Sequence, residues 1–318
     1  MRVLVTGATG YLGRALVRAV LAAGHIPVAF ARRASSSGLA VTLIDGDVRD
    51  GAAVAAAMAG CDAVCHAAAL VSIWRPEPRE FDEVNVGGLR NVLAAARRLD
   101  VARVVYTSSF LALPPAGTAT PVEANDYQRT KVAARAAALD AASAGAPVVC
   151  VYPGVVYGPG PPTPGNLVGG LVADALARRL PGLVGPDRIW SYSFVDDVAA
   201  GHVAALTAGT PAAEYGLGGE NVPQRRFFEL LRDARGIGIP RRIPYALAAM
   251  IGTVEEWRAR RSGHLPLVTR GAVDIFRHDW PVDSRAATRD LGYRITPLRD
   301  GLQRLLDALP HGSSPDSP

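Results

Sequence analysis

The segment YQRTK, residues 127–131, places a tyrosine four residues before the only lysine among the chain's 34 basic residues. Residues at this spacing lie on one face of a helix, within reach of each other. A nearby ammonium favours the phenolate and lowers the pKa of a tyrosine from its usual value near 10. Tyr127 and Lys131 are therefore predicted to form a proton-transfer pair. The bulkier, planar guanidinium of an arginine is not interchangeable with this lysine.

Signals for a helix surround this pair. Asn125 or Asp126 can cap its first turn, alanines fill its interior, and Gly145 is positioned to end it. The spacing YxxxK also arises by chance, and the alternative is an exposed tyrosine beside a solvated lysine. The position of the pair, 18 residues after a strand-ending serine in a chain with a phosphate-binding loop, favours proton transfer.

That loop is the glycine series Gly7, Gly10 and Gly13, which follows an apolar strand and opens a helix. Glycines there allow a tight turn, a close backbone approach to a pyrophosphate, and close packing of helix on strand. The N–H groups at a helix N-terminus bind phosphate. A purely structural turn is the alternative. The loop residues predicted to hold a dinucleotide are Gly7, Thr9, Gly10, Tyr11, Leu12 and Gly13.

The end of the second predicted strand, VAFARR, bears on which dinucleotide is bound. An acidic residue at this point binds the ribose hydroxyls of NAD, but this chain has Ala31 followed by Arg32 and Arg33. Guanidinium groups suit a 2′-phosphate, so NADP(H) is favoured as the cofactor and NAD(H) stays possible. The alternative is two solvated arginines in an arginine-rich chain.

Short apolar strands alternate with Ala-rich helical stretches over the first 110 residues, which predicts βαβ units and a parallel sheet. The expected fold is α/β, a Rossmann-type doubly wound parallel sheet with a smaller, mostly C-terminal α/β substrate-binding domain. The expected dinucleotide-binding domain spans 1–156 plus about 189–206. The substrate-binding domain would take about 157–188 and 207–310, and 311–318 would form a flexible tail.

The fifth strand, VVYTSSF, ends in hydroxyl residues at the carboxyl edge, where doubly wound sheets place their ligands. A serine there can donate a hydrogen bond to a substrate carbonyl and hold that carbonyl against Tyr127.

Several motifs resemble the short-chain dehydrogenase/reductase superfamily. Its TGxxGxxG loop is similar to residues 6–13, and its catalytic tyrosine and lysine match YQRTK. YPGVVYGPG, SFVDDVAAGHVAAL and YGLGGENV resemble its extended, epimerase/dehydratase-like branch. HAAALVSIWRPEPREFDEVNVGGLRNVL and LGYRITPLRDGLQRLL resemble the dihydroflavonol-reductase-like group, closest to plant farnesol-dehydrogenase-like proteins. The resemblance implies that the chain oxidises a lipophilic alcohol or reduces its carbonyl.

The resemblance also implies roles for individual residues. It makes Ser109 the catalytic serine, with Ser108 as the second choice, and it assigns Asn85 to support a lysine-linked water. A helix cap is the structural alternative for Asn85. The further cofactor contacts implied are Asp47 and Val48 at the adenine, Ala67, Ala68, Ala69 and Thr107 at strand ends, and Tyr152, Pro153, Gly154 and Val155 along the nicotinamide. The implied pocket lining is Ser109, Phe110, Asn166 and Phe194.

Composition excludes several classes of function. The net charge of +5 is scattered, without a basic tail, so no nucleic-acid partner is expected. The six histidines have no metal-ligand spacing, so no metal is expected. Three cysteines are read as buried thiols, and no apolar run is long enough to span a membrane, so a cytoplasmic protein without a membrane partner is expected. A homodimer stays possible.

Three functions remain open. The first is an NAD(P)-dependent oxidoreductase for a small, lipophilic alcohol or carbonyl. The second is a nucleotide-sugar epimerase or dehydratase with tightly held NAD. A common dehydratase carries acidic residues after the catalytic hydroxyl, whereas Ser109 is followed by Phe110 and Leu111. The third is a non-catalytic dinucleotide sensor, although such proteins often lose the tyrosine or lysine that this chain keeps.

Overall fold

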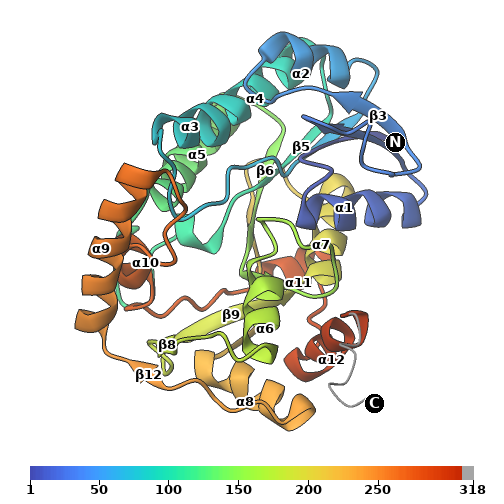
Figure 1. The fold of residues 1–318 in the computed structure, drawn as a ribbon. Helices are drawn as coiled ribbons and strands as arrows, with labels where there is room; N and C mark the ends of the chain where they lie inside the picture. Colours follow the sequence, from blue (N-terminus) through green and yellow to red (C-terminus); the bar gives the residue numbers. More distant parts are fainter. Residues whose placement is uncertain (310–318) are drawn as a thin grey trace.

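The computed structural model describes residues 1–309, which include a seven-stranded parallel sheet (Figure 1). Its strands are β1 (Arg2–Thr6), β2 (Ile26–Ala31), β3 (Thr42–Asp45), β4 (Ala63–His66), β5 (Arg103–Thr107), β6 (Val148–Pro153) and β10 (Glu214–Leu217). The order across the sheet is β10-β6-β5-β4-β1-β2-β3. The order reverses beside β1, between β4 and β2, which is where doubly wound sheets bind their ligands.

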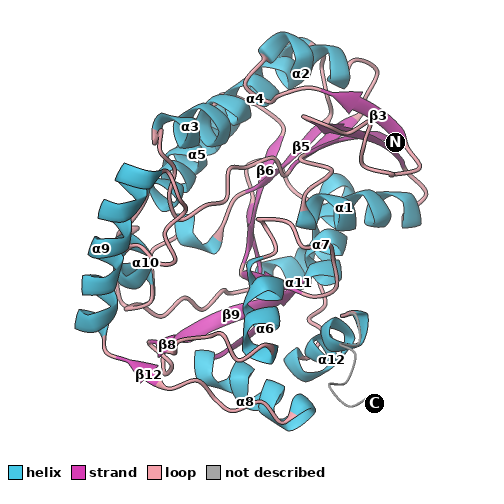
Figure 2. Cartoon of the chain, in the orientation of Figure 1, coloured by secondary structure: helices cyan, strands magenta, loops and turns pink. Residues whose placement is uncertain are grey.

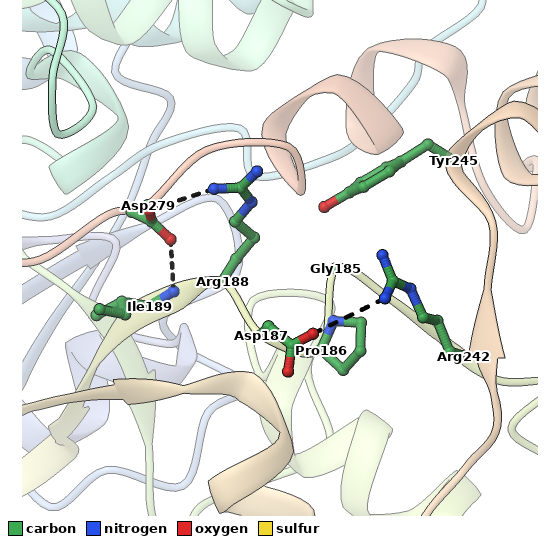
Figure 3. Close-up of a pocket in the computed structure, with 8 residues that line it drawn as sticks. All are labelled: Gly185, Pro186, Asp187, Arg188, Ile189, Arg242, Tyr245 and Asp279. Carbon is green, nitrogen blue, oxygen red and sulfur yellow. Dashed lines mark hydrogen bonds and ion pairs between the residues drawn. The ribbon is translucent and has the colours of Figure 1, made fainter.

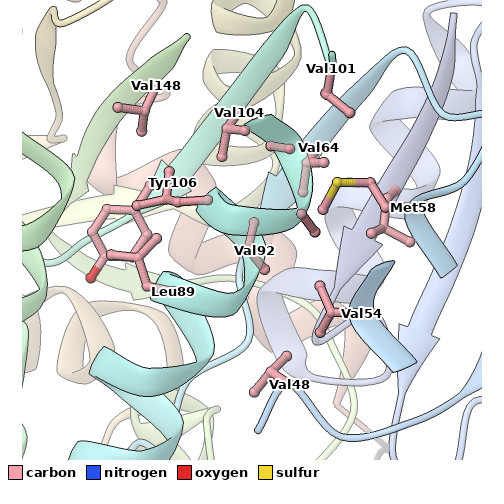
Figure 4. Packing of buried hydrophobic residues seen from close by; sticks show 14 of the residues in the cluster. Val48, Val54, Met58, Val64, Leu89, Val92, Val101, Val104, Tyr106 and Val148 are labelled. Atoms are coloured by element: carbon pink, nitrogen blue, oxygen red, sulfur yellow. The ribbon is translucent and has the colours of Figure 1, made fainter. Parts of the chain in front are cut away.

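Helices cover both faces of this sheet. One face carries α2 (Gly51–Met58), α4 (Gly88–Arg98) and α5 (Asp126–Ser143), and the other carries α1 (Tyr11–Ala22), α7 (Val195–Thr207) and α11 (Arg285–Leu291). Alternate strand residues supply the two cores: Leu4 packs toward α2 and α4 (Figure 4), whereas Val3 and Val5 pack toward α1 and α7. Burial on both faces explains why the strands are continuous apolar runs in the sequence.

A smaller unit lies beyond the carboxyl edge of the sheet (Figure 2). Its strands are β7 (Val155–Tyr157), β9 (Ile189–Phe194) and β11 (Glu220–Pro223) in one sheet, and β8 (Leu183–Val184) and β12 (Arg242–Ile243) in another. Its helices are α6 (Leu167–Leu176), α8 (Gln224–Arg235), α9 (Tyr245–Ser262), α10 (Arg270–Ile275) and α12 (Leu298–Ala308). The short helix α3 (Arg79–Phe81) precedes a π-helical segment, Asp82–Gly87.

The predicted fold class is confirmed, and the three cysteines are buried and free as expected. The division into domains stays a prediction, and two strands differ from it. Strand β9, expected to return to the main sheet, pairs with β7 and β11, whereas β10, expected in the smaller domain, extends the main sheet beside β6. Both strands are short segments next to glycine-rich turns, so their pairing depends on distant partners. The tail expected at 311–318 lies outside the described residues.

The packing in Figure 4 predicts the energetic weight of α4. Leu89 is fully buried between α4 and the sheet, so Leu89→Ala leaves a cavity and is expected to lower the free energy of unfolding by about 2–5 kcal/mol. Leu21 is 49% exposed on α1, and Leu21→Ala is expected to change stability by less than about 0.5 kcal/mol. Denaturant unfolding followed by circular dichroism measures both. Equal losses in the two variants would contradict this account of the core.

Candidate active site

Helix α5 brings Tyr127 and Lys131 to the carboxyl end of β5. Asn125 caps the helix by accepting a hydrogen bond from the Gln128 backbone N–H at 2.9 Å, which decides between the two predicted caps. Four residues after Tyr127, the Lys131 ammonium is buried and donates to the backbone carbonyl of Thr107 at 3.0 Å. Its Nζ lies 6.0 Å from the ring centre of Tyr127. The predicted pair therefore shares one side of α5, facing the sheet.

Burial governs the ionisation of this pair. It raises the pKa of Tyr127 to about 12, opposed by the nearby Ser109 hydroxyl, and it lowers the pKa of Lys131 to about 8. Within the protein itself, the pKa of Tyr127 thus moves in the opposite direction from the sequence-based expectation, because loss of solvent outweighs the attraction of an ammonium 6.0 Å away. At neutral pH the phenol keeps its proton and the lysine keeps its charge.

The two candidate serines follow Thr107 directly and have different environments. Ser109 is buried, and its Oγ accepts from the Leu111 N–H at 3.2 Å. This bond starts the 3₁₀ turn Phe110–Ala112 and leaves the hydroxyl proton of Ser109 able to donate. The Ser108 Oγ is buried without a hydrogen-bond partner among residues 1–309. Ser109 is the serine close to the phenol of Tyr127, which favours it over Ser108.

Gln128 holds this turn against α5, and sequence reasoning missed it. Its side chain is fully buried, donates to the Leu111 carbonyl at 3.2 Å and accepts from the Ala124 N–H at 3.1 Å. The serine turn and the tyrosine helix are thereby fixed to each other. The sequence offers little signal for this role, because a glutamine beside Tyr127 also fits an exposed helix position.

Asn85 connects the segment after β4 to α5. It is buried inside the π-helical segment Asp82–Gly87, so the helix-cap alternative is wrong. Its Oδ1 accepts from the Leu70 N–H at 2.7 Å, and its Nδ2 donates to the Thr130 hydroxyl at 3.0 Å. A π-helical turn inside a longer helix is frequent at functional sites. The assignment of Asn85 to a lysine-linked water stays a prediction.

Two buried histidines lie on the same polar layer, and sequence reasoning assigned neither. The His202 Nδ1 is 2.7 Å from the Val198 carbonyl, which can only accept, so Nδ1 carries the proton. Its Nε2 then accepts from the Thr107 hydroxyl at 2.8 Å. Across the sheet, the His66 Nδ1 lies 2.8 Å from the Thr6 hydroxyl. Thr107 therefore links Lys131, through its carbonyl, to His202, through its hydroxyl.

The glycine loop has the tight geometry that a dinucleotide site needs. Gly7 has φ +69, and a Cβ there would lie 2.8 Å from the backbone of Ala68. A Cβ on Gly13 would lie 2.0 Å from the Gly7 carbonyl oxygen. Helix α1 begins after Gly10 with no side-chain cap, so its first N–H groups are available to an anion. This cradle fits the pyrophosphate of a dinucleotide. Thr9 and Leu12 lie in the same turn.

Tyr11 closes the loop from above. Its hydroxyl donates to the Gly158 carbonyl at 2.9 Å, and a Cβ on Gly160 would lie 2.5 Å from its ring. Tyr11 therefore joins the predicted phosphate loop to the chain that follows β7. Its side chain has a structural contact that the sequence did not reveal.

The predicted ribose and adenine contacts lie at the ends of β2 and β3. Arg32 and Arg33 are exposed and their side chains make no ion pair with residues 1–309, so both guanidinium groups are available to a phosphate. Asp47 pairs with Arg49 at 2.8 Å, which holds the pKa of its carboxyl below the usual range. Val48 is buried and packs against Gly88.

The segment expected along the nicotinamide divides by its contacts. The Tyr152 side chain is buried in the core, and its hydroxyl bonds to Glu214 and to Arg135, so this side chain cannot serve a cofactor. Gly154 approaches β9 closely, with its N–H donating to the Ser193 hydroxyl at 3.1 Å. Pro153 ends β6, and Val155 packs on the apolar cluster described next.

An apolar cluster borders Tyr127. Its buried members are Phe110, Leu111, Ile275, Trp280 and Val282, and Ala124, Tyr127, Val155 and Trp190 pack against it. The ring of Phe110 lies 5.7 Å from that of Trp280 and 6.1 Å from that of Trp190. Phe110 is thus next to the candidate proton-transfer tyrosine, as the predicted pocket lining requires. The two tryptophans were missed, because they lie more than 60 residues further along the chain.

The other predicted pocket residues have structural roles. Asn166 caps α6, accepting from the Gly169 N–H at 3.0 Å and donating to the Pro161 carbonyl at 3.2 Å, so both ends of its amide are engaged. Phe194 is buried in a separate C-terminal core, with its ring 5.7 Å from that of Tyr157. The structure therefore does not bring either side chain to the Tyr127 site. Sequence alone does not distinguish a helix cap from a ligand contact.

A separate pocket of about 340 Å³ lies in the C-terminal unit (Figure 3). Its arginines are already paired, Arg188 with Asp279 at 3.4 Å and Arg242 with Asp187 at 3.9 Å. Tyr245 lines the pocket and donates to the Phe276 carbonyl at 2.9 Å. With its charges balanced internally, this pocket has neither the proton-transfer pair nor a free cation for a phosphate among the residues that line it.

A doubly wound sheet with an anion-binding glycine loop and a buried Tyr–Lys pair defines a dinucleotide-dependent enzyme. Residues 3–218 match the model of the NAD dependent epimerase/dehydratase family, and the chain belongs to that family. As predicted, this is the extended branch of the short-chain dehydrogenase/reductases, and the protein is an NAD(P)-dependent oxidoreductase.

Individual proteins resemble the chain over nearly its whole length. "Sterol demethylase protein B" of Methylococcus capsulatus is 34% identical, covering 94% of this chain and 95% of its own. The "4-hydroxy-2-methyl-3-oxo-4-farnesyl-3,4-dihydroquinoline-1-oxide ketoreductase" of Stigmatella aurantiaca is 32% identical and covers 98% of both.

Among solved structures, that of gox2253 has a TM-score of 0.80 at 30% identity, covering 96% of this chain and 97% of its own. A Thermus thermophilus UDP-glucose 4-epimerase in complex with NAD has a TM-score of 0.75 at 23% identity, covering 97% of this chain and 98% of its own. The second similarity shows the fold alone.

The buried histidines predict how stability depends on pH. Burial lowers the pKa of His202 to about 4, and burial with the charge of Lys131 lowers that of His66 to about 3. In the unfolded chain both titrate near 6.5. As the pH falls from about 6.5 toward 4, the unfolded state therefore takes up protons that the folded state refuses, and stability is lost.

We expect the urea midpoint to fall between about pH 7.5 and pH 5. His202→Gln is expected to be less stable at the higher pH, because it disturbs the bond to Thr107, but to lose less stability on acidification. A pH slope identical to that of the unmodified protein would show that His202 is not held neutral.

Proposed function

We propose that the chain interconverts an alcohol and a carbonyl on a small lipophilic substrate, with NADP(H) as its favoured cofactor. The observation that carries this proposal is the surroundings of Tyr127. Its phenol lies close to the Ser109 hydroxyl on one side, and its ring packs against the cluster of Phe110 and Trp280. Proton transfer and an apolar substrate wall are thus supported at the same side chain.

A nicotinamide held by the glycine loop supplies or accepts the hydride. In the direction of reduction, Tyr127 gives its phenolic proton to the carbonyl oxygen while Ser109 donates a hydrogen bond to the same oxygen. The raised pKa of Tyr127, about 12, keeps that proton on the phenol until the oxygen becomes basic. The phenolate left behind is stabilised by the Lys131 ammonium, 6.0 Å from the ring centre.

The fixed geometry of Lys131 is part of this proposal. Its bond to the Thr107 carbonyl occupies one of three ammonium protons, which leaves two donors for a ribose hydroxyl or a water. A guanidinium is longer and planar and does not fit the same buried space at the end of β5. The single lysine of the chain is therefore proposed to serve both the phenol and the cofactor ribose.

The relatives support a lipophilic substrate by their names, which refer to a sterol and to a farnesyl-bearing quinoline. The nucleotide-sugar epimerase alternative is supported by the fold of the Thermus thermophilus enzyme at 23% identity. It is disfavoured by the aromatic wall beside Tyr127 and by the paired arginines in the C-terminal pocket. A tightly bound NAD in the purified protein, with no response to added NADPH, would favour that alternative.

Tyr127→Phe tests the chemistry. Loss of the phenolic proton is expected to reduce kcat by about 10²–10⁴-fold while cofactor binding stays within a factor of a few, because the glycine loop is unchanged. Turnover is followed by nicotinamide absorbance with aldehydes, ketones and prenyl alcohols as substrates. Tyr245→Phe removes a phenol in the separate pocket and serves as the control with unchanged turnover. Full activity of Tyr127→Phe would refute the proton-transfer assignment.

Arg32→Asp tests the choice of cofactor. Replacing an unpaired guanidinium by a carboxylate removes a phosphate contact and adds repulsion, so the ratio of kcat/KM for NADP over NAD is expected to fall about tenfold or more. Arg98→Asp makes the same change at an exposed position on α4 and is expected to leave the ratio unchanged. An unchanged ratio in Arg32→Asp would mean that this arginine does not contact the 2′-phosphate.

A further inference from the structure

Helix α9 directs its small residues inward and its large apolar residues outward. Its buried positions are Ala248, Gly252 and Ala259. A Cβ on Gly252 would lie 2.8 Å from the Arg270 backbone nitrogen, so α9 packs closely on the start of α10. A helix on the surface of a globular protein usually has the reverse arrangement, with its large apolar side chains in the core.

The outward residues repeat every three or four positions, and they therefore share one face of the helix. Trp257 is 55% exposed and Met250 is 59% exposed, and Leu267 in the following loop is 88% exposed. Contiguous exposed apolar patches of this kind mark interaction sites. We call this surface the α9 face, and it consists of Leu247, Met250, Ile251, Val254 and Trp257.

The charges around the α9 face are positive at both ends. Arg258 and Arg261 continue the stripe four and seven residues after Val254, and the Arg261 guanidinium lies 4.1 Å from the ring centre of Trp257. Arg241 and Arg242 precede the first turn and are exposed.

The acidic residues of the helix do not balance this charge on the outward face. Glu255 accepts from the Leu267 N–H at 3.2 Å and Glu256 from the Arg270 N–H at 2.7 Å. These bonds direct both carboxylates toward the loop 263–270. The outward face therefore combines apolar side chains with arginines.

We propose that the α9 face docks on an anionic membrane surface. An exposed helix with a tryptophan and large aliphatic side chains on one face and arginines beside them has the features of an interfacial helix. Its arginines can reach lipid phosphates while the apolar side chains enter the headgroup layer. No helix within residues 1–309 is long and apolar enough to cross a membrane, so the contact is one of surface docking.

Charge disfavours a second copy of the chain as the occupant. A two-fold contact through antiparallel α9 helices would place Arg258 and Arg261 of one copy near Arg241 and Arg242 of the other. Like charges facing each other oppose that pairing, whereas anionic lipid neutralises both ends at once. This proposal departs from the sequence-based expectation of no membrane partner, which rested on the lack of a spanning segment.

The position of α9 suits the proposed substrate, but the docking proposal does not depend on that substrate. Helix α9 packs on α10, and Ile275 of α10 belongs to the apolar cluster beside Tyr127. A lipophilic alcohol taken from the membrane would therefore meet the protein near its apolar wall. The evidence for docking is the surface itself, so failure of the proposed activity leaves it standing.

Co-sedimentation of the full-length protein with vesicles tests the proposal. We expect binding to vesicles of phosphatidylcholine and phosphatidylglycerol, weaker binding to phosphatidylcholine alone, and a loss of binding at high salt. Val254→Glu places a carboxylate in the centre of the stripe and is expected to weaken binding at least tenfold. Arg261→Gln is expected to weaken it about fivefold at low ionic strength.

Two further variants keep the test specific. Leu21→Glu introduces the same charge at a residue 49% exposed on α1, and its binding is expected to equal that of the unmodified protein. Trp257→Phe keeps an apolar ring, so it is expected to bind but to lose most of the blue shift in tryptophan fluorescence on adding vesicles. Circular dichroism checks that each variant is folded.

Two results would overturn the proposal. The first is that the unmodified protein ignores anionic vesicles, or that Val254→Glu binds them as the unmodified protein does. The second is a concentration-dependent dimer in sedimentation velocity that Val254→Glu abolishes, which would assign the α9 face to a second copy of the chain.

Discussion

The hydrogen bond from the Lys131 ammonium to the Thr107 carbonyl joins helix α5 to the carboxyl end of β5, and the arrangement of the site follows from it. An ammonium buried at this depth needs acceptors, because an unpaired charge in a low dielectric is costly. One acceptor is a strand-end carbonyl, so the helix position is fixed relative to the sheet. Tyr127, one turn earlier, is fixed with it.

Other polar contacts brace this junction from several elements. Asn85 bonds to Leu70 after β4 and to Thr130 in α5, Gln128 bonds to the serine turn, and His202 of α7 accepts from the Thr107 hydroxyl. Each of these side chains is buried and paired, and such networks make a site rigid. The strand ends that carry the small residues, the serines and the lysine acceptor are thereby held in one geometry.

The same site contains two opposed environments. On the sheet side, buried polar groups keep Lys131 charged at neutral pH while His66 and His202 stay neutral. On the other side, Phe110, Trp190 and Trp280 exclude water from the vicinity of the phenol. Exclusion of water strengthens the electrostatic interactions within a site. It also explains why burial dominates the pKa of Tyr127.

The sequence determined the features that depend on local spacing. Strand–helix alternation predicted the doubly wound sheet, three glycines at fixed intervals predicted the tight turn before α1, and the i, i+4 pair predicted a shared helix face. Each of these follows from backbone geometry over a few residues. The lone lysine in an arginine-rich chain marked the right position for the same reason, since a compact buried ammonium has no arginine substitute.

Only the tertiary structure decided the contacts between distant residues. Thr107 and His202 are 95 positions apart, Trp280 reaches the Tyr127 wall from the C-terminal unit, and β10 rather than β9 extends the main sheet. Asn166 and Phe194 matched a pocket by motif, yet one caps a helix and the other fills a core. No local pattern encodes such partners, because the energy of a buried side chain depends on what the whole chain folds around it.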